Sequence, residues 1–327
     1  MLKFLLFLTQ RFSLVLIATL ILGISFQEIA ALANPCIKPL LMFGIYLSLL
    51  KIDFSVLKAE LKNPLLQFYI LLFTNFILPI TLFLLMKSIC LIFSINIHWA
   101  IAVLVLFGSP TASMVPSICI LMKGHVERAI ISMLLSSLVV PFSLPLIIRL
   151  MNGYSVQFDT LKMIFDLSFM ITIPIILTLI SKFLFKELCH KTLPYIPALS
   201  VLVLAIIVLG CVDGLTIVIL NNPTQLIIGV IIAYAMAFCA FLLGWLFPYK
   251  GSIQDRTTIA IFAAWPNVGL VIVISNLYFK VDYPIILLFA IIYEIPWNTA
   301  FVPAQKFIQW KYNQTSKTLK KETNVGS

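Results

Sequence analysis

Two polar clusters, each built around a proline, interrupt apolar segments of this chain at residues 108–117 and 264–269. Proline removes a backbone donor and clashes with the preceding helical turn, so each segment is expected to unwind there. Unwound backbone inside a membrane leaves peptide groups in need of a partner, and a bound solute or ion can supply it. The candidate binding residues of the clusters are Ser109, Thr111, Ser113, Ser117 and Asn267, and the candidate helix-breaking residues are Pro110, Pro116 and Pro266.

The chemistry open to these clusters is the binding of a small ion or polar solute. Hydroxyl and carbonyl oxygens suit a cation, whereas the N–H groups at the start of a half-helix favour an anion. The Asn267 amide can donate and accept at once, and it is costly in hydrocarbon unless it is paired. Any single hydroxyl has a second interpretation, because it can bond back to its own helix or help helices pack closely. The clustering of hydroxyls with prolines favours a binding site.

Polar residues also occur in two other apolar stretches. Glu294 and Asn298 lie in the last of them, and Thr74 and Asn75 lie in an early one. Because lipid disfavours a charged carboxylate, Glu294 is a candidate proton carrier; a position at the interface, or permanent pairing with Lys or Arg, is the alternative. Thr74 and Asn75 are expected either to complete an ion shell or to pack helices together.

The elements that must position these residues are transmembrane helices. Of the 327 residues 62% are hydrophobic and 10% are charged, and the mean hydropathy is +1.12. With about 20 apolar residues needed per crossing, we expect a single all-α polytopic transmembrane domain over residues 1–327, with about ten helices. The expected spans are residues 12–32, 35–50, 65–86, 98–121, 129–149, 161–181, 195–212, 225–247, 257–279 and 284–308, with a cytoplasmic tail at 309–327.

Five helices followed by five more have opposite orientations in the membrane, which makes an inverted repeat. The expected repeats cover residues 12–149 and 161–308, and three proline pairs support the offset between them. These are Pro35 and Pro194, Pro39 and Pro197, and Pro110 and Pro266, at separations of 156 to 159 residues. In this arrangement the broken fourth and ninth helices cross near the bilayer midplane.

The positive charges follow the pattern expected of a membrane protein. Counted on ten spans with a cytoplasmic N-terminus, 17 of the 22 Lys and Arg residues fall on the cytoplasmic side, as the positive-inside rule requires. We therefore expect both termini in the cytoplasm, an inner-membrane location, the lipid bilayer as a partner and no nucleic acid. The first span imitates a secretory signal ending at Ala31-Leu32-Ala33. It is expected to be retained, because its loss would leave nine spans.

Catalysis, a cofactor and a bound metal are not expected. The six cysteines lack CxxC spacing, and neither an HExxH motif nor a set of paired acids or an activated nucleophile occurs. Two acidic residues near predicted membrane edges have structural interpretations. Asp166, close to Lys162, is expected in an interfacial ion pair, and Asp213 is expected to end its span in water.

A series of short segments occurs in an order and at spacings that match a known family. They are Leu41-Met42-Phe43-Gly44, Leu47, Leu49, Asp53-Phe54, Thr111-Ala112-Ser113, Lys123-Gly124-His125-Val126, Leu144-Pro145-Leu146, Arg256-Thr257-Thr258-Ile259, Asn267-Val268-Gly269-Leu270 and Trp297-Asn298. Over about residues 12–307 the chain thus resembles the bile acid:sodium symporter family. The resemblance implies ten helices in a panel and a core domain, alternating access, and organic-anion substrates such as sterol or carboxylate anions.

The chain departs from the family's pattern at positions to which the resemblance assigns sodium binding. Met114 stands in place of an Asn, and Ala129 and Met133 stand where hydroxyl ligands are implied. Phe262 and Pro266 stand in place of a Glu and a Gln. A hard cation needs several oxygens and negative charge, so these replacements argue against a sodium ion as the coupling ion. The alternatives are coupling to protons and no coupling ion.

The expected function is secondary transport of a small organic anion through a crossover site made by Thr111, Ser113 and Asn267. Three alternatives stay open. They are an arsenite exporter, for which Cys119 lies near the relevant helix, a weak-acid exporter of a related family, and a non-transporting receptor that keeps the carrier fold.

Overall fold

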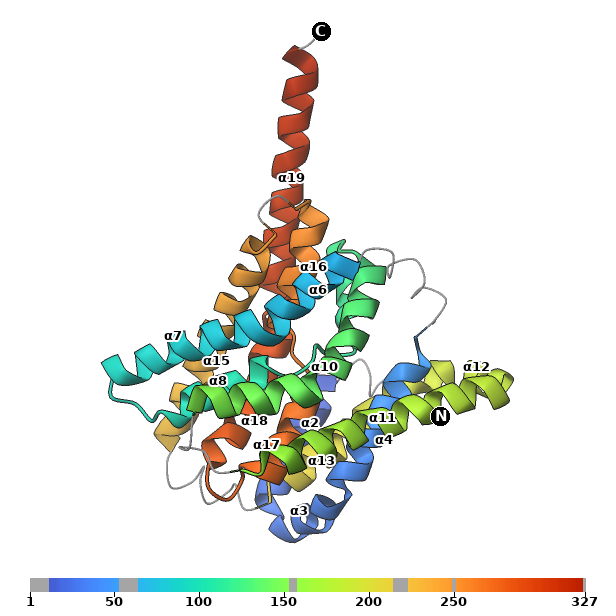
Figure 1. Ribbon diagram of the computed structural model, residues 1–327, viewed down its shortest axis with the longest axis vertical. Helices are drawn as coiled ribbons and strands as arrows, with labels where there is room; N and C mark the ends of the chain where they lie inside the picture. Colours follow the sequence, from blue (N-terminus) through green and yellow to red (C-terminus); the bar gives the residue numbers. More distant parts are fainter. Residues whose placement is uncertain (1–11, 53–63, 153–157, 214–222, 249–250, 326–327) are drawn as a thin grey trace.

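The computed structural model describes residues 12–52, 64–152, 158–213, 223–248 and 251–325, and the regular elements in these ranges are helices (Figure 1). The first half contains α2 (Phe12–Ser25), α3 (Gln27–Ala33), η1 (Asn34–Cys36), α4 (Ile37–Leu50), α6 (Pro64–Leu72), the π-helical turn η3 (Phe73–Ile77), α7 (Leu78–Ile92), α8 (His98–Phe107), α9 (Val115–Met122) and α10 (Val126–Asn152). The second half contains α11 (Thr160–Leu184), α12 (Lys186–Thr192), η4 (Leu193–Tyr195), α13 (Ile196–Cys211), α15 (Pro223–Leu246), α16 (Ile253–Ala264), α17 (Val268–Tyr278), α18 (Pro284–Thr299) and α19 (Phe301–Val325).

The helices identify a multi-pass integral membrane protein. Within the described ranges six helical stretches are long and apolar enough to cross a membrane, and α18 with the first half of α19 makes a seventh that is bent by 43°. This number is lower than the ten spans expected from hydropathy. The difference lies in α2, which has 14 residues, and in the pairs α8–α9 and α16–α17, which are interrupted.

The first two expected spans have different boundaries in the structure. A separation was expected between residues 32 and 35, but the chain is helical from Gln27 to Leu50 and leaves the helix at Phe26 instead. Pro35 lies in the first turn of η1. The chain passes through this short 3-10 turn directly from α3 into α4, so the proline is accommodated without ending the helical stretch.

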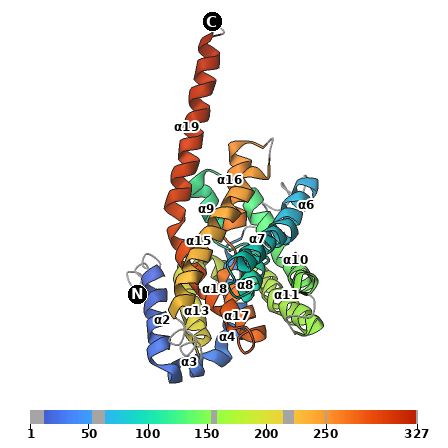
Figure 2. The same cartoon turned by 90° about the vertical axis from the view of Figure 1, so that its left-hand side faces the viewer.

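The helices form two groups. The panel helices are α2, α3, α4, α11, α12 and α13, in which α13 packs on α2, α3 and α4, and α11 packs on α4 and α12. The remaining helices are the core helices, in which α8 packs on α7 and α18, and α16 packs on α9 and α15. The two groups meet where α17 packs on α4 and α13, and where α10 packs on α11. Figures 1 and 2 show both groups, with α19 extending past the rest of the molecule.

The most deeply buried elements are the short helices beside the two proline clusters. Every residue of α8 from Trp99 to Phe107 is at most 3% exposed, and the residues of α17 from Leu270 to Ser275 are at most 1% exposed. Helices this short cannot span a bilayer alone, since about 20 residues are needed. Burial of this kind is the condition under which interrupted backbone is tolerated inside a membrane.

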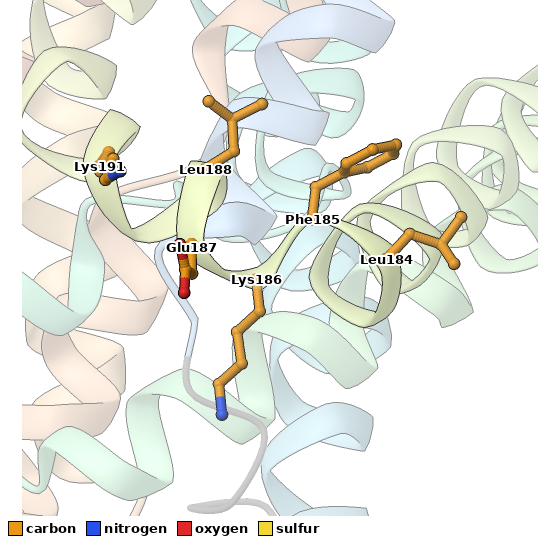
Figure 3. Close-up of a pocket in the computed structure, with 6 residues that line it drawn as sticks. All are labelled: Leu184, Phe185, Lys186, Glu187, Leu188 and Lys191. Atoms are coloured by element: carbon orange, nitrogen blue, oxygen red, sulfur yellow. The ribbon is translucent and has the colours of Figure 1, made fainter.

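A surface hollow of about 430 Å³ lies at the elbow between α11 and α12. Figure 3 shows Phe185 and Leu188 on one side of the chain, with Lys186 and Glu187 on the other. Phe185 and Leu188 are 57% and 60% exposed. Apolar side chains beside a lysine suit a membrane–water interface, so the elbow is a surface feature of the panel helices.

Candidate functional site

The first interruption covers residues 108–114, between α8 and α9. Gly108 closes α8 by donating its N–H to the Leu104 carbonyl at 2.8 Å. A Cβ at this position would lie 2.8 Å from both the Leu104 carbonyl oxygen and Leu144 Cδ1, so the close approach requires glycine. Ser109 Oγ donates to the Leu106 carbonyl at 2.7 Å. Pro110 lies within the non-helical stretch.

Pro116 has a different role from the helix-breaking one expected of it. It lies in the first turn of α9, after Met114 as the N-cap residue. Its fixed φ and missing N–H fit that position, so Pro116 starts a helix next to the break. The interruption itself depends on Pro110.

The second interruption is shorter and covers residues 265–267, between α16 and α17. The Trp265 N–H still donates to the Ile261 carbonyl, at 3.1 Å, and the helix ends there. Asn267 then caps α17, because its Oδ1 accepts from the Leu270 N–H at 3.1 Å. Pro266 between them supplies no N–H, so the chain cannot continue the α16 ladder.

The two interruptions bond to each other. The Ala112 N–H donates to the Trp265 carbonyl at 3.0 Å, and the Asn267 N–H donates to the Pro110 carbonyl at 2.8 Å. These bonds flank Thr111 and Pro266, which face each other in a single antiparallel bridge. Four peptide groups that lose their helical partners beside the prolines therefore find partners in the opposite interruption. The two hydrogen bonds fix the position of one interruption relative to the other.

Aromatic side chains of α18 satisfy two more carbonyls of the second break. Tyr293 Oη donates to the Ala264 carbonyl, and Trp297 Nε1 donates to the Pro266 carbonyl, each at 3.1 Å. In return, Trp265 Nε1 donates to the Trp297 carbonyl at 3.0 Å. Sequence reasoning named Trp297 only as part of a family segment, and it missed Tyr293. The available signal was two donor-bearing aromatic residues four apart in an apolar run, which places both on one face of the helix.

One side of the crossover is exposed. Ser113 is exposed, and its Oγ accepts from Ser48 Oγ of the panel helix α4 at 3.2 Å. Ser117, in the first turn of α9, is also exposed. Ser48 was missed by the sequence analysis, although it is the polar residue between Leu47 and Leu49 of α4, which are both buried. The open hydroxyls thus lie where a core helix meets a panel helix.

The electrostatics of the crossover favour an anion. Both α9 and α17 begin at the breaks, so the partial positive charges of two helix N-termini point toward the same region. The breaks themselves contain no acidic residue. Ser109 and Thr111 are only 5% and 4% exposed, which leaves Ser113, Ser117 and the half-buried Asn267 as the accessible polar residues.

Thr74 and Asn75 lie in η3, and Asn75 belongs to a separate polar row that faces α10. Asn75 Oδ1 accepts from Ser136 Oγ at 2.8 Å, and eight residues earlier Gln67 Oε1 accepts from Ser132 Oγ at 2.7 Å. Thr74 Oγ1 donates to the carbonyl of Ile70 in its own helix. The row therefore joins helices. Sequence reasoning missed the two serines, which lie four residues apart and therefore on one face of α10.

Glu294 and Asn298 lie on α18 on either side of Trp297, and both are half-buried. Asn298 Nδ2 donates to the Glu294 carbonyl at 2.7 Å and to Glu294 Oε2 at 3.4 Å. These described bonds join the two residues to each other and to their own helix. Neither bond connects them to Ser113.

One end of the molecule carries two ionic networks that join the panel helices to α17 and its C-terminal end. Asp166 of α11 accepts from Lys38 of α4 at 2.7 Å and from Tyr278 of α17 at 2.5 Å. Asp213 accepts from Lys280 at 3.2 Å and from Asn34 of η1 at 3.0 Å. We name this end the Lys280 end. Lys38 and Lys280 are thus the ion-pair partners where sequence proximity suggested Lys162 for Asp166 and water for Asp213.

The opposite end, which we name the Asp255 end, ties core helices together. Asp255 forms a capping box with Ser252 at the start of α16 and an ion pair with Arg128 of α10. The His125 N–H donates to Thr258 Oγ1 at 2.8 Å, and Tyr312 of α19 donates to the Lys123 carbonyl at 2.9 Å. The turn between α9 and α10 is therefore fixed to α16 and α19.

The cysteines are all unpaired in the described part of the chain, and Cys119 is fully buried. In the same part of the chain His, Cys, Asp and Glu side chains form no group of three or more that could hold a metal ion.

A family model described as the Sodium Bile acid symporter family matches residues 38–216. The match extends from α4 to just past α13 and includes the first interruption. A comparison with curated proteins finds no match. Since the matched residues make up more than half of the 327 residues, the chain belongs to the sodium bile acid symporter family.

Proposed function

We propose that the protein is a secondary transporter of a small organic anion, which binds at the crossover beside Thr111, Ser113 and Asn267. The observation that carries this proposal is the mutual bonding of the two interruptions, with Ser113 exposed beside Ser48 at the junction of core and panel. Broken helices that meet at membrane depth are the usual design of a carrier site.

The anion preference follows from the groups that stay accessible. Most carbonyls of the second break already have donors in Tyr293, Trp297 and Ala112. The hydroxyls of Ser113 and Ser117, the Nδ2 group of Asn267 and the partial positive charge of two helix N-termini remain for the solute. These groups can donate hydrogen bonds to a carboxylate or sulfonate.

Alternating access would use the boundary between panel and core helices. In this proposal the chain is an inverted repeat of ten spans with both termini in the cytoplasm. The interrupted pairs α8–α9 and α16–α17 then occupy corresponding positions in the two halves. The Lys280 end faces outward, and the pairs Lys38–Asp166 and Lys280–Asp213 hold panel and core together there. Transport would require these contacts to open when the opposite side closes.

We propose further that sodium is not the coupling ion. The positions to which the family resemblance assigns sodium ligands carry Ala129, Met133 and Phe262, which are at most 5% exposed and apolar. Asn75 and Gln67, the nearby amides of the early helix, are engaged by Ser136 and Ser132. Glu294 is the candidate for proton coupling, and uncoupled transport is the alternative.

Reconstituted vesicles test the proposal. Purified protein is first screened by thermal shift against carboxylate and sulfonate anions, because a ligand of the folded state raises the unfolding temperature. Flux of a stabilising anion is then measured in proteoliposomes with sodium and pH gradients set independently. We expect saturable flux without a sodium requirement. Binding without flux would indicate a receptor, and strict sodium dependence would reject the coupling assignment.

A further inference from the structure

A cavity of about 470 Å³ lies among the core helices, against the second interruption. Its walls come from α15, from α18 and from the first turns of α19, and the indole of Trp265 forms part of its inner wall. The cavity lies where α18 and α19 meet at a 43° bend. Its principal lining residues are Tyr234, Ala237, Phe238, Phe241, Trp265 and Phe307.

The lining suits an apolar chain. The hydroxyls of Tyr234 and Thr299 bond to each other at 2.6 Å, and the Trp265 N–H is engaged by the Trp297 carbonyl. The polar groups of the wall are thus already paired, and a ligand needs to bring no hydrogen bonds. A polar solute would lose its hydration here without compensation.

Part of the cavity lining is exposed at the surface of the molecule. Phe238 and Leu242 at its edge are 67% and 40% exposed, and they lie on α15, a helix long and apolar enough to span a membrane. The medium that faces such an edge is the acyl-chain region of the bilayer. An acyl chain is therefore available at the opening.

Positive charge lies at one end of the cavity. The Lys311 ammonium lies 5.9 Å from the ring centre of Phe307, which lines the cavity, and 4.6 Å from that of Trp310. Lys306 lies three residues after the lining residue Pro303, on the same side of α19. A half-exposed Trp beside Lys is typical of the membrane interface, where phospholipid headgroups lie. This end is complementary in charge to an anionic headgroup.

We propose that the cavity binds one acyl chain of an anionic phospholipid, with the headgroup at Lys306 and Lys311 and the chain against Trp265. The lining residues come from α15, α16, α18, α19 and the residues that adjoin them, and Trp265 is the one that belongs to the second interruption. The exposed crossover residues Ser113 and Ser117 are not among the lining residues. The backbone carbonyl of Trp265 accepts the Ala112 N–H. An acyl chain that packs against the Trp265 side chain would therefore stabilise the hydrogen-bonded pair of interruptions. The inference does not depend on the proposed transport function.

The first test uses the unmodified protein. Full-length protein is reconstituted with phosphatidylglycerol that carries a photoactivatable group in its acyl chain, and adducts are mapped by peptide mass spectrometry. We expect adducts on residues 234–242 and 296–307, reduced by excess unlabelled phosphatidylglycerol. Adducts spread evenly over the lipid-facing helices, or absent from these two segments, would overturn the proposal.

The second test fills the cavity. Ala237→Phe places a ring in the wall, whereas Ala235→Phe places one on the exposed side of the same helix, two residues away. Native mass spectrometry with phosphatidylglycerol should show binding to the Ala237→Phe variant at least tenfold weaker, and Ala235→Phe should bind as the wild type does. Equal binding by both variants would reject the site, and thermal unfolding in detergent checks that each is folded.

The headgroup is tested by comparing phosphatidylglycerol with phosphatidylcholine. Lys306→Gln with Lys311→Gln should remove most of the preference for the anionic lipid and leave binding of phosphatidylcholine unchanged. If a transported organic anion without an acyl chain displaces the photoactivatable lipid, the cavity belongs to the transport path and the lipid assignment is wrong.

Discussion

At the scale of single residues, the crossover depends on donors that replace lost helical bonds. Pro110 and Pro266 interrupt the helices, but the freed carbonyls are engaged by Asn267, Trp297 and other groups. A buried carbonyl without a donor costs about 1–3 kcal/mol. The aromatic residues of α18 are therefore as much a part of the breaks as the prolines are.

Tyr293→Phe removes only the hydroxyl that donates to the Ala264 carbonyl. The residue is fully buried, so water cannot replace the lost bond. We expect a loss of about 1–3 kcal/mol in stability, seen as a lower unfolding temperature in detergent. Tyr69→Phe is the matched control, because Tyr69 is 56% exposed on α6 and should change the unfolding temperature little. Equal effects of the two substitutions would contradict the assigned role of Tyr293.

Ser113→Ala tests the accessible hydroxyl of the crossover. Because Ser113 is exposed, its loss should leave the unfolding temperature of the free protein unchanged. Loss of one hydrogen bond of about 1 kcal/mol to the bound anion corresponds to roughly fivefold weaker binding. The measurement is the concentration dependence of the ligand-induced thermal shift. Ser88→Ala, an exposed serine that bonds its own helix, should bind like the wild type; identical affinities for all three proteins would remove Ser113 from the site.

At the scale of helices, hydropathy and proline predicted much of what the structure contains. Each expected span falls on a helix or on an interrupted pair, because apolar segments must satisfy their backbone bonds within themselves. The helical stretch from Gln27 to Leu50 was not predicted, because a proline in a first turn is compatible with helix.

The contacts across the crossover could be anticipated only in part. Paired proline clusters indicated two breaks, yet no local pattern shows that Ala112 bonds Trp265 or that Ser48 faces Ser113. Such contacts join residues more than 60 positions apart, and the packing of whole helices decides them. The same holds for Asp166, whose partners lie on α4 and α17.

Gly108→Ala tests how closely α8 must approach its neighbours where it ends. The new Cβ would lie 2.8 Å from a backbone oxygen and from Leu144, so a shift of packed atoms is required. We expect a loss of about 1–3 kcal/mol, measured as a lower unfolding temperature. Gly44→Ala in α4 meets only Val203, at 3.4 Å, and should be neutral or slightly stabilising. An unchanged unfolding temperature for Gly108→Ala would show that the packing at this break is loose.

At the scale of the whole molecule, panel and core helices are joined at the Lys280 end by two ionic networks. The carboxyl groups of Asp166 and Asp213 come from panel elements, whereas Tyr278 and Lys280 belong to α17 and its C-terminal end. Polar contacts between two groups of helices can be exchanged at modest cost, because partly exposed ion pairs contribute little. Such contacts can hold the panel and core helices in one arrangement and still allow them to adopt another.

Asp166→Asn should loosen the Lys280 end. The Lys38–Asp166 pair is partly exposed, so the expected loss is roughly 0.5–1 kcal/mol and the fold should persist. Amide hydrogen exchange at 275–283 and 34–41 should become up to about fivefold faster. Asp282→Asn, an exposed carboxylate at the same end, is the control and should leave exchange unchanged. Unaltered exchange in the Asp166→Asn variant would show that the Lys38–Asp166 pair does not hold the panel and core helices together.

The most direct test of the crossover is a disulfide between its two facing residues. Thr111 and Pro266 form an antiparallel pair flanked by hydrogen bonds, for which the Cα atoms lie about 4.5 Å apart, within the range of disulfide bonds. On mild oxidation the Thr111→Cys, Pro266→Cys double variant should yield a linked peptide in mass spectrometry. Thr111→Cys with Val273→Cys, roughly 10 Å further along α17, should not. Free thiols in the first variant, or equal linkage in both, would contradict a crossover of the two interrupted helices.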